Sequence, residues 1–546
     1  MNTCSTRRRI LAAGAAAVAT ATLASCSGSG AASEGGSGGT FVFAASRLPT
    51  VLDGAYVYDN ESQRVIYQIF ERLVNVKPGT TEVTGELAKS WEVSPDGLDY
   101  TFQLRDGVKF HDGTTLDAQA VCFNFDRLYN LKGPAQGLAE YWRISFRGFA
   151  TAEDGKPASS RYKSCEVKDP ATLVLHLKER YTPLLASLAS IGFGIASPTA
   201  LKKYGYDVEL SGDSMKFVGT FGTAHPVGSG PFQFKSWEPG KKVTLERFDG
   251  YWGSKAKINT LIYVPIDDGQ ARRQALERGE IDGYDNVAPQ DVAALKSSGY
   301  EVTERPPSNV GYLAMNQSFA PLGDLRVRQA IAHAIDVDAL LKANFLAGAK
   351  KPKSFLPPTF LGFNPDVTTY DYDPAKAKEL LAGVDNKKLD IWYATEVSRP
   401  YMPDPKSIAE TFKSYLEKVG FEVTLTGRPW SPDFLSSIRS GKAPMYIVGL
   451  LPDMADPANF FTIFDNQPKR WGQLPKSLLT HIKEAEEAPA EQRDAMYKAL
   501  NEELMKDVPG IPYVHAPTHL AFAKGVKGFV PSPLFAESMA SVSLGS

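Results

Sequence analysis

Beyond its first 26 residues, the chain has no apolar run long enough to cross a membrane. We therefore expect no transmembrane helix in residues 27–546. The run ILAAGAAAVATATLA, residues 10–24, follows the basic stretch MNTCSTRRR and is too short for a comfortable transmembrane helix. A basic segment before a short apolar one is typical of an export signal. We therefore expect residues 41–546 to fold as a water-soluble body outside the cytoplasm.

The export signal, residues 1–26, ends in Leu23-Ala24-Ser25-Cys26. This ending resembles the lipobox of bacterial lipoproteins, in which the cysteine is lipidated and becomes the mature N-terminus. An ordinary signal peptide with a nearby cysteine is the alternative. The stretch TRRRIL, residues 6–11, also looks like a twin-arginine signal, so the sequence leaves the export route open. Residues 27–40 are rich in Gly and Ser, and we expect them to form a flexible tether behind the lipid anchor at Cys26.

The folded part is too long for one hydrophobic core, because domains usually hold roughly 100–200 residues. We expect two or three lobes. The chain has 60 Lys and Arg residues against 62 Asp and Glu residues, which gives a net charge of −2. Nucleic-acid binding usually needs a basic face, so this balance gives no reason to expect a nucleic acid as partner.

Two of the four cysteines, Cys122 and Cys165, lie outside the export signal. In an oxidising compartment, two such thiols predict a disulfide; two separate buried thiols are the alternative. No second pair of suitably spaced ligands accompanies them, so we expect no zinc or other metal site.

Local patterns predict β-hairpins in the first half of the chain. Tyr100, Phe102 and Leu104 alternate before the turn residues Asp106-Gly107, and residues 108–110 continue the alternation, which predicts a hairpin. Residues 226–234 predict a turn that enters a strand, and residues 243–248 predict another strand.

Helix signals dominate the second half. Asp324 and Asp373 are predicted N-caps, the second with Pro374 at the first helical position. A helix is expected over about 405–418 and a strand over 421–426. This helix–strand alternation predicts an α/β layer.

Motifs of catalysis are absent from the sequence. It contains no H-E-x-x-H zinc motif, no G-x-S-x-G elbow, no phosphate-binding loop and no G-x-G-x-x-G after a strand. His515 and His519 have the spacing of helical metal ligands, but Pro517 lies between them, so we interpret both as structural. We expect no catalytic residues, no enzyme activity and no cofactor.

Several stretches, in this order, resemble the extracytoplasmic solute-binding proteins of peptide ABC importers, known as family 5. The stretches are ELAKSWEVSPDGLDYTFQLRDGVKFHDG (86–113), HPVGSGPFQFKSW (225–237) with LERFDGYWG (245–253), NVGYLAMN (309–316), LRVRQAIAHAIDVDAL (325–340) and YDPAKAKELL (372–381). The resemblance runs from about Leu87 to the C-terminal region. It implies an α/β, two-lobed fold of the periplasmic-binding-protein type II class, with an extra subdomain inserted in the first lobe.

The resemblance also implies a division of the chain. Residues 41–308 are expected to form lobe I, including the inserted subdomain at about 75–225. Residues 309–514 are expected to form lobe II, and residues 515–546 to return to lobe I. Ligands in this architecture lie between the lobes, whose closure buries them.

The stretch Arg399-Pro400-Tyr401-Met402-Pro403 resembles the R-P-Y-x-P loop of the dipeptide-binding branch. In that branch the arginine holds the C-terminal carboxylate of the peptide. A planar guanidinium suits this role, because it can donate two parallel charged hydrogen bonds to a carboxylate. The flanking prolines would keep the backbone stiff and lower the ordering cost of binding. Tyr401 is expected to line the same pocket, or else to be a core tyrosine.

The stretch from Gly449 to Asp453, GLLPD, resembles the G-W-x-x-D pattern of the same branch. The resemblance implies that Asp453 binds the peptide amine and that backbone groups of Gly449 and Leu451 pair with the peptide as an added strand. Leu450 stands in place of the tryptophan and Pro452 in place of a small residue, and both changes could reshape the side-chain pocket. Asp456 is expected to shape the following turn.

Tyr58 and Asp59 fall where the other lobe could meet the ligand. Together these residues predict a lipid-anchored, monomeric receptor for short peptides, most simply dipeptides, that delivers them to the permease subunits of an ABC importer. One alternative is a receptor of the same fold for an oligosaccharide, haem or a metal complex. Another, from a different class, is an exported hydrolase.

Overall fold

The computed structural model describes residues 38–57, 59–152, 155–211, 214–345 and 348–545. The described residues belong to one compact unit. The predicted lipidation site Cys26 and the predicted ligand contact Tyr58 lie outside the described residues. No helix within the described ranges combines the length and the apolar character that crossing a bilayer requires.

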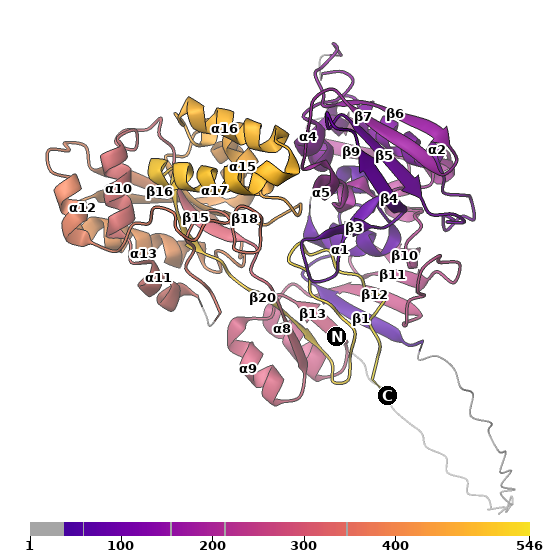
Figure 1. The fold of residues 1–546 in the computed structure, drawn as a ribbon. Coiled ribbons are helices and arrows are strands. Elements are labelled where there is room, and N and C mark those ends of the chain that lie inside the picture. The colour runs from indigo at the N-terminus through magenta and orange to yellow at the C-terminus, as the bar shows by residue number, and fades with distance from the viewer. Residues whose placement is uncertain (1–37, 58, 153–154, 212–213, 346–347, 546) are drawn as a thin grey trace, which may run out of the picture. The chain divides into compact units, whose positions relative to one another are not determined.

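We call lobe I the part built on a seven-stranded sheet, ordered β10-β11-β12-β1-β13-β20-β14 (Figure 1). Its strands are β1 (Thr40–Ala45), β10 (Phe232–Glu238), β11 (Lys242–Arg247), β12 (Thr260–Pro265), β13 (Gly283–Asp285), β14 (Glu301–Arg305) and β20 (Thr518–Phe522). Strand β1 runs parallel to β12 and β13, whereas β20 pairs antiparallel with β13 and β14. A strand from the C-terminal part of the chain therefore lies inside the sheet that the N-terminal part begins.

A four-stranded antiparallel sheet, ordered β4-β5-β7-β6, forms a further layer next to the lobe I core. Its strands are β4 (Ala88–Val93), β5 (Asp99–Leu104), β6 (Tyr162–Asp169) and β7 (Thr172–Leu177). Two-stranded sheets are formed by β2 (Val74–Val76) with β3 (Val83–Gly85) and by β8 (Asp207–Ser211) with β9 (Ser214–Val218). A disulfide joins Cys122 of helix α2 to Cys165 of β6. This subdomain lies between β1 and β10 in the sequence.

The helices of lobe I cover these sheets. They are α1 (Asn60–Ile69), α2 (Ala118–Tyr129), α3 (Pro134–Leu138), α4 (Glu140–Phe146), α5 (Leu184–Leu188), α6 (Pro198–Tyr204), α7 (Phe221–Ala224), α8 (Gly269–Glu277) and α9 (Pro289–Ser297), with the 3-10 turns η1 (Gly54–Tyr56) and η2 (Ile191–Phe193).

The prediction of a hairpin over residues 100–110 is wrong. Strand β5 lies between β4 and β7, and residues 108–110 form a single bridge, Lys109 to Thr115, instead of a strand. The alternation arose because Val108 and Phe110 are both buried in the core, and burial alone gives the same period as a strand. The place beside β5 is taken by β7, which comes far later in the sequence.

Two of the stretches singled out in the sequence meet at Glu71. Ser229 of the first stretch donates a hydrogen bond to the Glu71 carboxylate at 2.8 Å, and Tyr251 and Trp252 of the second donate at 2.9 and 2.8 Å. A Cβ atom at Gly228 would lie 2.1 Å from the carbonyl oxygen of Ile69, so only glycine allows this approach. These stretches therefore anchor β10 and its neighbours to the end of α1.

We call lobe II the part built on a five-stranded sheet, ordered β17-β16-β18-β15-β19. Its strands are β15 (Val310–Met315), β16 (Lys388–Thr395), β17 (Glu422–Pro429), β18 (Met445–Leu450) and β19 (Gly510–Val514). Its helices, which gather around the sheet in Figure 1, are α10 (Leu325–Ala334), α11 (Val337–Asn344), α12 (Pro374–Leu380), α13 (Pro405–Lys418), α14 (Leu435–Arg439), α15 (Ala458–Asp465), α16 (Lys476–Glu487) and α17 (Ala490–Asp507), with the short turns η3 (Trp430–Phe434) and η4 (Pro468–Arg470).

Helix caps in lobe II form where the sequence predicted them. The side chain of Asp324 accepts a hydrogen bond at the start of α10, and Asp373 does so at the start of α12 with Pro374 in the first turn. Helix α13 begins and ends at the predicted residues, and β17 follows it. Such carboxylate caps satisfy backbone N–H groups that a helix start leaves unpaired.

The chain passes between the lobes twice, from β14 to β15 and from β19 to β20. Asn309 joins the two connections: its side chain donates to the carbonyl of Ala516 at 2.6 Å and accepts from the Ala516 N–H at 3.0 Å. His515 lies beside it, buried, with Nδ1 at 2.6 Å from the Asn309 carbonyl. His519 is in a strand, so the pair does not share a helix.

A buried ion cluster lies next to these connections, at the end of β14. The Arg305 guanidinium donates to both carboxylate oxygens of Asp285, at 2.7 and 2.9 Å, and to Glu537. Glu537 lies in the part of the chain after β20, residues 523–545, which we call the C-terminal segment. Arg64 of α1 also binds Asp285. Burial alone would raise the pKa of Asp285, but the charges of Arg305 and Arg64 overcome it and hold the pKa well below its usual value.

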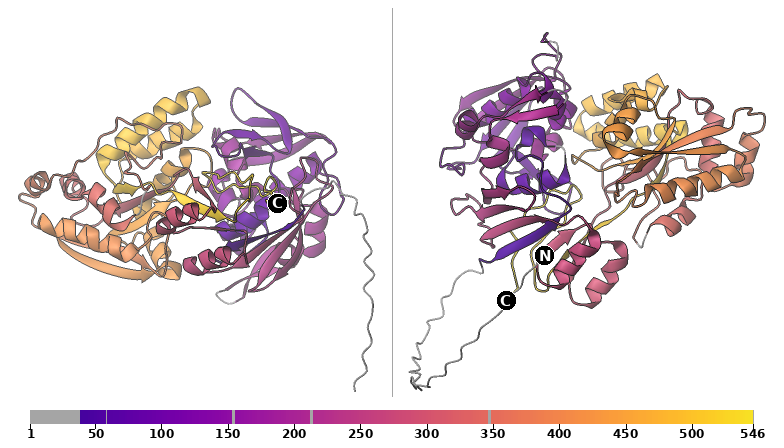
Figure 2. Two further views of the ribbon diagram at one scale, coloured as in Figure 1. Left: turned by 90° about the horizontal axis from the view of Figure 1, so that it is seen from below. Right: turned by 180° about the vertical axis from the view of Figure 1, so that it is seen from behind.

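Figure 2 shows from two further sides that the C-terminal segment, in yellow, follows the elements of lobe I. The Met539 N–H donates to Gln68 of α1, and the Lys257 N–H donates to the carbonyl of Ala540. Contacts with α1 and with Arg305 therefore hold the C-terminal segment in position.

Replacing Arg305 with methionine should lower the free energy of unfolding by about 3–5 kcal/mol, because Asp285 then keeps Arg64 as its cation and Glu537 loses its close ion pair. Arg278 is a matched control, since its pair with Glu280 is exposed, and Arg278→Met should leave stability unchanged. Urea unfolding followed by circular dichroism measures both. Equal effects of the two substitutions would contradict the role given to the cluster.

Candidate ligand-binding site

Three strands of lobe II end at one edge of its sheet. Strands β16 and β17 run parallel, and so do β16 and β18, so their carboxyl ends lie at the same edge. Arg399 follows β16, Trp430 follows β17 and Asp453 follows β18. The topology thus brings the two predicted charged residues to one edge of one sheet.

Arg399 begins a tight turn that Pro400 and Tyr401 complete. Its N–H donates to the Met402 carbonyl at 3.2 Å, and the Met402 N–H donates back at 2.9 Å. The half-buried guanidinium lies over the ring of Trp430, 5.4 Å from its centre. It makes no salt bridge with any carboxylate of the described residues. An oriented cation on a rigid turn is therefore available to an anion.

Tyr401 packs under this turn and is 5% exposed, so it is a core residue of lobe II. Burial raises its pKa to about 12, although the charge of Arg399 opposes the shift. Its ring lies against Gly449, where a Cβ atom would come within 2.4 Å of it. The glycine of the predicted pattern is thus needed for the tyrosine of the other predicted pattern to fit.

The backbone of β18 is partly unpaired where Gly449 lies. Strand β16 pairs with β18 only at Met445 and Tyr446, whereas β15 pairs along the whole strand. Gly449 and Leu451 are half-exposed. On the side away from β15, no described strand pairs with Gly449, so its backbone groups are available to an added strand.

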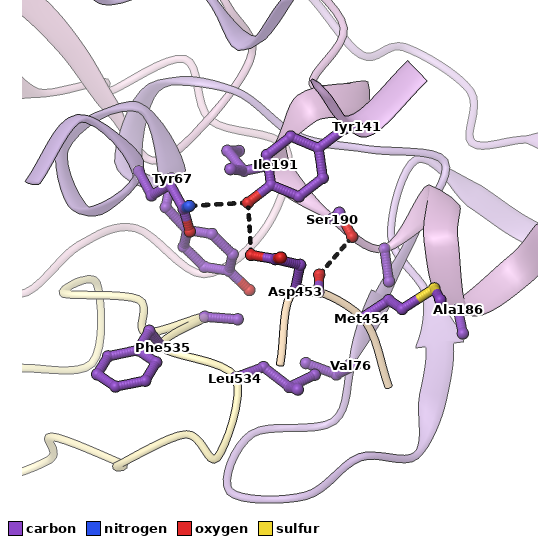
Figure 3. Close-up of a pocket in the computed structure, with 13 residues that line it drawn as sticks. Tyr67, Val76, Tyr141, Ala186, Ser190, Ile191, Asp453, Met454, Leu534 and Phe535 are labelled. Atoms are coloured by element: carbon purple, nitrogen blue, oxygen red, sulfur yellow. Dashed lines mark hydrogen bonds between the residues drawn. The ribbon is translucent and has the colours of Figure 1, made fainter. Parts of the chain in front are cut away.

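Asp453 is held by three hydrogen bonds, two of them from lobe I. Its N–H donates to Asn459 Oδ1 at 3.0 Å, and its carbonyl accepts from Ser190 Oγ at 2.7 Å. The hydroxyl of Tyr141 donates to Asp453 Oδ1 at 3.2 Å, and Gln63 donates to the same hydroxyl at 2.7 Å (Figure 3). Oδ2 has no hydrogen-bond partner among the residues that the structure describes.

The side chain of Asp453 is exposed to solvent between the lobes, with protein atoms on several sides of it. Desolvation, and then the negative charge of Glu140, raise its pKa to about 6, while the Tyr141 hydrogen bond opposes the shift. Such a carboxylate gains from a cationic ligand group, because the cation offsets the lost hydration.

Asp59 is the N-cap of α1 and is buried. Its carboxylate accepts from the Ser62 N–H at 3.0 Å and from the Ser62 and Thr50 hydroxyls at 2.7 Å each. These contacts indicate that Asp59 has a structural role at the start of α1. Asp456 caps the start of α15 and binds Arg493 at 2.6 and 2.7 Å, which fixes the loop behind Asp453 as the turn-shaping expectation requires.

Sequence reasoning missed the lobe I side of this cleft. A narrow cavity beside Asp453 is lined by side chains from both lobes and from the C-terminal segment (Figure 3): Gln63, Tyr67, Tyr141, Ser190, Met454 and Phe535. These residues belong to no shared motif and are far apart in the sequence, so only the tertiary fold identifies them. Arg399 does not line this cavity. Among the described residues there is no group of three or more potential metal ligands.

Comparisons with known proteins agree with this architecture. The family described as bacterial extracellular solute-binding proteins, family 5 middle, matches residues 82–471. A dipeptide-binding protein of Escherichia coli K12 is 32% identical over 514 residues, 91% of this chain and 92% of that protein. Heme-binding protein A of Haemophilus influenzae is 29% identical, and the match covers 93% of each chain.

A solved structure shares the fold. It is the ABC transporter-associated periplasmic binding protein DppA from Helicobacter pylori in complex with the peptide STSA, at 28% identity and a TM-score of 0.75. The similarity covers 94% of this chain and 99% of that one. The family match spans well over half of the chain, and the chain belongs to the family 5 extracellular solute-binding proteins, a two-lobed fold of receptors for solutes.

Proposed function

We propose that this protein is a lipid-anchored extracytoplasmic receptor for short peptides, dipeptides above all, and that it delivers them to the permease of an ABC importer. In this proposal Arg399 holds the C-terminal carboxylate of the peptide and Asp453 holds its ammonium group. Backbone groups of Gly449 and Leu451 pair with the peptide main chain. The protein acts as a monomer.

One observation carries the proposal: a cation and an anion, each without a charged partner among the described residues, lie at the same edge of the lobe II sheet. A short peptide offers the complementary pair of charges. Each charge, once the lobes close, is costly without a partner, so the site favours a ligand with both. A longer peptide would place its carboxylate beyond Arg399, which favours dipeptides.

The names of relatives support peptides as the ligand class, since they include a dipeptide-binding protein and a structure with the peptide STSA. Another relative is a heme-binding protein, and haem or another charged solute is the second candidate. Two uncompensated charges make neutral sugars poor ligands for this site. Turnover of any peptide by the purified protein would instead favour an exported hydrolase.

Calorimetric titration of the protein lacking residues 1–26 with a mixed dipeptide library tests the proposal. We expect dipeptide binding that Arg399→Ala and Asp453→Ala each weaken at least a hundredfold, because each leaves a peptide charge unpaired. C-terminally amidated and N-acetylated dipeptides should fail to bind the unmodified protein.

Arg428 and Asp433 provide a matched control at the same edge of the sheet. They pair with each other at 2.9 Å, so their charges are already satisfied, and Arg428→Ala and Asp433→Ala should leave binding unchanged. No heat with any dipeptide, or binding indifferent to Arg399 and Asp453, would show that the ligand is another solute.

Peptide affinity should depend on pH through Asp453. The ammonium group needs the ionised carboxylate, and the pKa of this group is about 6. Affinity should therefore be highest near pH 7 and fall about tenfold by pH 5, with release of protons on binding in that range. It should also fall above about pH 8, where the α-amino group of the peptide loses its own proton. Calorimetry in buffers of different ionisation enthalpy measures both. A flat profile from pH 8 to 5 would argue against Asp453 as the amine site.

The anchor part of the proposal rests on Cys26. When the full chain is produced in bacteria that are fed a labelled fatty acid, we expect label on the protein and recovery in the membrane fraction. Cys26→Ala should lose the label and leave the membrane. An unlabelled wild-type protein would instead indicate an ordinary signal peptide.

A further inference from the structure

The contacts of Asp453 cross from one lobe to the other. The lobe II residue receives hydrogen bonds from Tyr141 of α4 and from Ser190, both in lobe I. Three of its four polar groups are thus occupied, and Oδ2 alone remains unpaired among the described residues. The hydrogen bond from Tyr141 therefore limits rotation of the Asp453 carboxylate about its Cβ–Cγ bond and turns Oδ1 towards lobe I.

The direction of these hydrogen bonds follows from chemistry. An ionised carboxylate can only accept, so the single proton of the Tyr141 hydroxyl must point to Asp453 Oδ1. The hydroxyl oxygen then has to accept from its other partner, which requires the amide nitrogen of Gln63 to face it. Gln63 thus sets the direction in which Tyr141 donates.

The ring of Tyr141 is fixed in place as well. It is 8% exposed and lies against Gly192 of η2, where a Cβ atom would come within 2.5 Å of the tyrosine side chain. Glu140 and Asp59 are the charged groups of lobe I that act on this tyrosine beside Asp453, and Tyr67 lines the same cavity. Among the described residues that line this cavity, none from lobe I is positively charged.

We infer that Tyr141, oriented by Gln63, is a positioning residue: it holds Oδ1 of Asp453 across the boundary between the lobes and leaves Oδ2 for the ligand ammonium. The inference rests on the proposed function for its ligand and on the geometry for the rest. It makes the amine end of the site complete only when lobe I and lobe II meet. Asp453 on lobe II alone lacks the hydrogen bond that orients it.

The first test needs no ligand. In protein with ¹³C-labelled aspartate, the carboxyl signal of Asp453, assigned by its loss in Asp453→Asn, is followed through a pH titration. Tyr141→Phe removes a hydrogen bond that favours the ionised form, so the titration midpoint should rise above the wild-type value. Gln63→Glu should raise it further, because the new carboxylate takes the tyrosine proton and adds a like charge.

The second test uses dipeptides. Tyr141→Phe should weaken binding about tenfold at pH 7, and this deficit should grow as the pH falls from 8 to 6. A merely structural defect would give the same deficit at every pH. Tyr100→Phe is the matched control, because it removes a buried hydroxyl that donates to the Tyr181 carbonyl at 3.2 Å instead of to Asp453.

The outcomes distinguish the positioning role of Tyr141 from the proposed function of the protein. An unchanged titration midpoint in Tyr141→Phe overturns the inference whatever the ligand is. A raised midpoint together with peptide binding that ignores Asp453 overturns the proposed function, and with it the assignment of Oδ2 to an ammonium group. A pH-independent deficit in Tyr141→Phe equal to that of Tyr100→Phe also overturns the inference.

Discussion

The end of lobe I from which the chain leaves for lobe II depends on how Arg305 satisfies two buried acids at once. It stands at the end of β14, just before the chain leaves lobe I, and binds Asp285 of β13 and Glu537 of the C-terminal segment. Charges this deep are tolerated only with paired partners in good geometry. A few residues further on, Asn309 and Ala516 join the two connections between the lobes. The contacts of Arg305 in lobe I therefore hold both connections at the point where they leave that lobe.

The site follows from the order of strands in lobe II. Parallel β16, β17 and β18 bring three loops to one edge, so residues from three separate stretches face the same region. Two of the loops are stiffened independently of any ligand: the turn at Arg399 by its own backbone, and the loop at Asp453 by Asp456 and Arg493. Rigid loops lose little entropy on binding, and in the proposed function the charges of Arg399 and Asp453 then decide which ligand is accepted.

Features that depend on neighbours in the sequence were predictable, and those that depend on distant partners were not. The caps at Asp324 and Asp373 and the limits of α13 follow from local chemistry, and the structure confirms them. The prediction of a hairpin over residues 100–110 is wrong, because β7 pairs with the edge of β5 that residues 108–110 would have needed. The family resemblance led to Arg399 and Asp453, but no local pattern could point to Tyr141 and Gln63, which reach Asp453 only through the fold.

The position of β20 inside the lobe I sheet has a consequence for how the protein is made. Lobe II strands β15 to β19 come from one continuous stretch, so that lobe can assemble from residues that emerge together. Lobe I begins with the first strand of the chain but lacks the strand between β13 and β14 until residues 518–522 arrive. Lobe I therefore begins first and is completed last. Until β20 is in place, one edge of β13 is unpaired and β14 has no neighbouring strand in the sheet, and such open edges can pair with other chains.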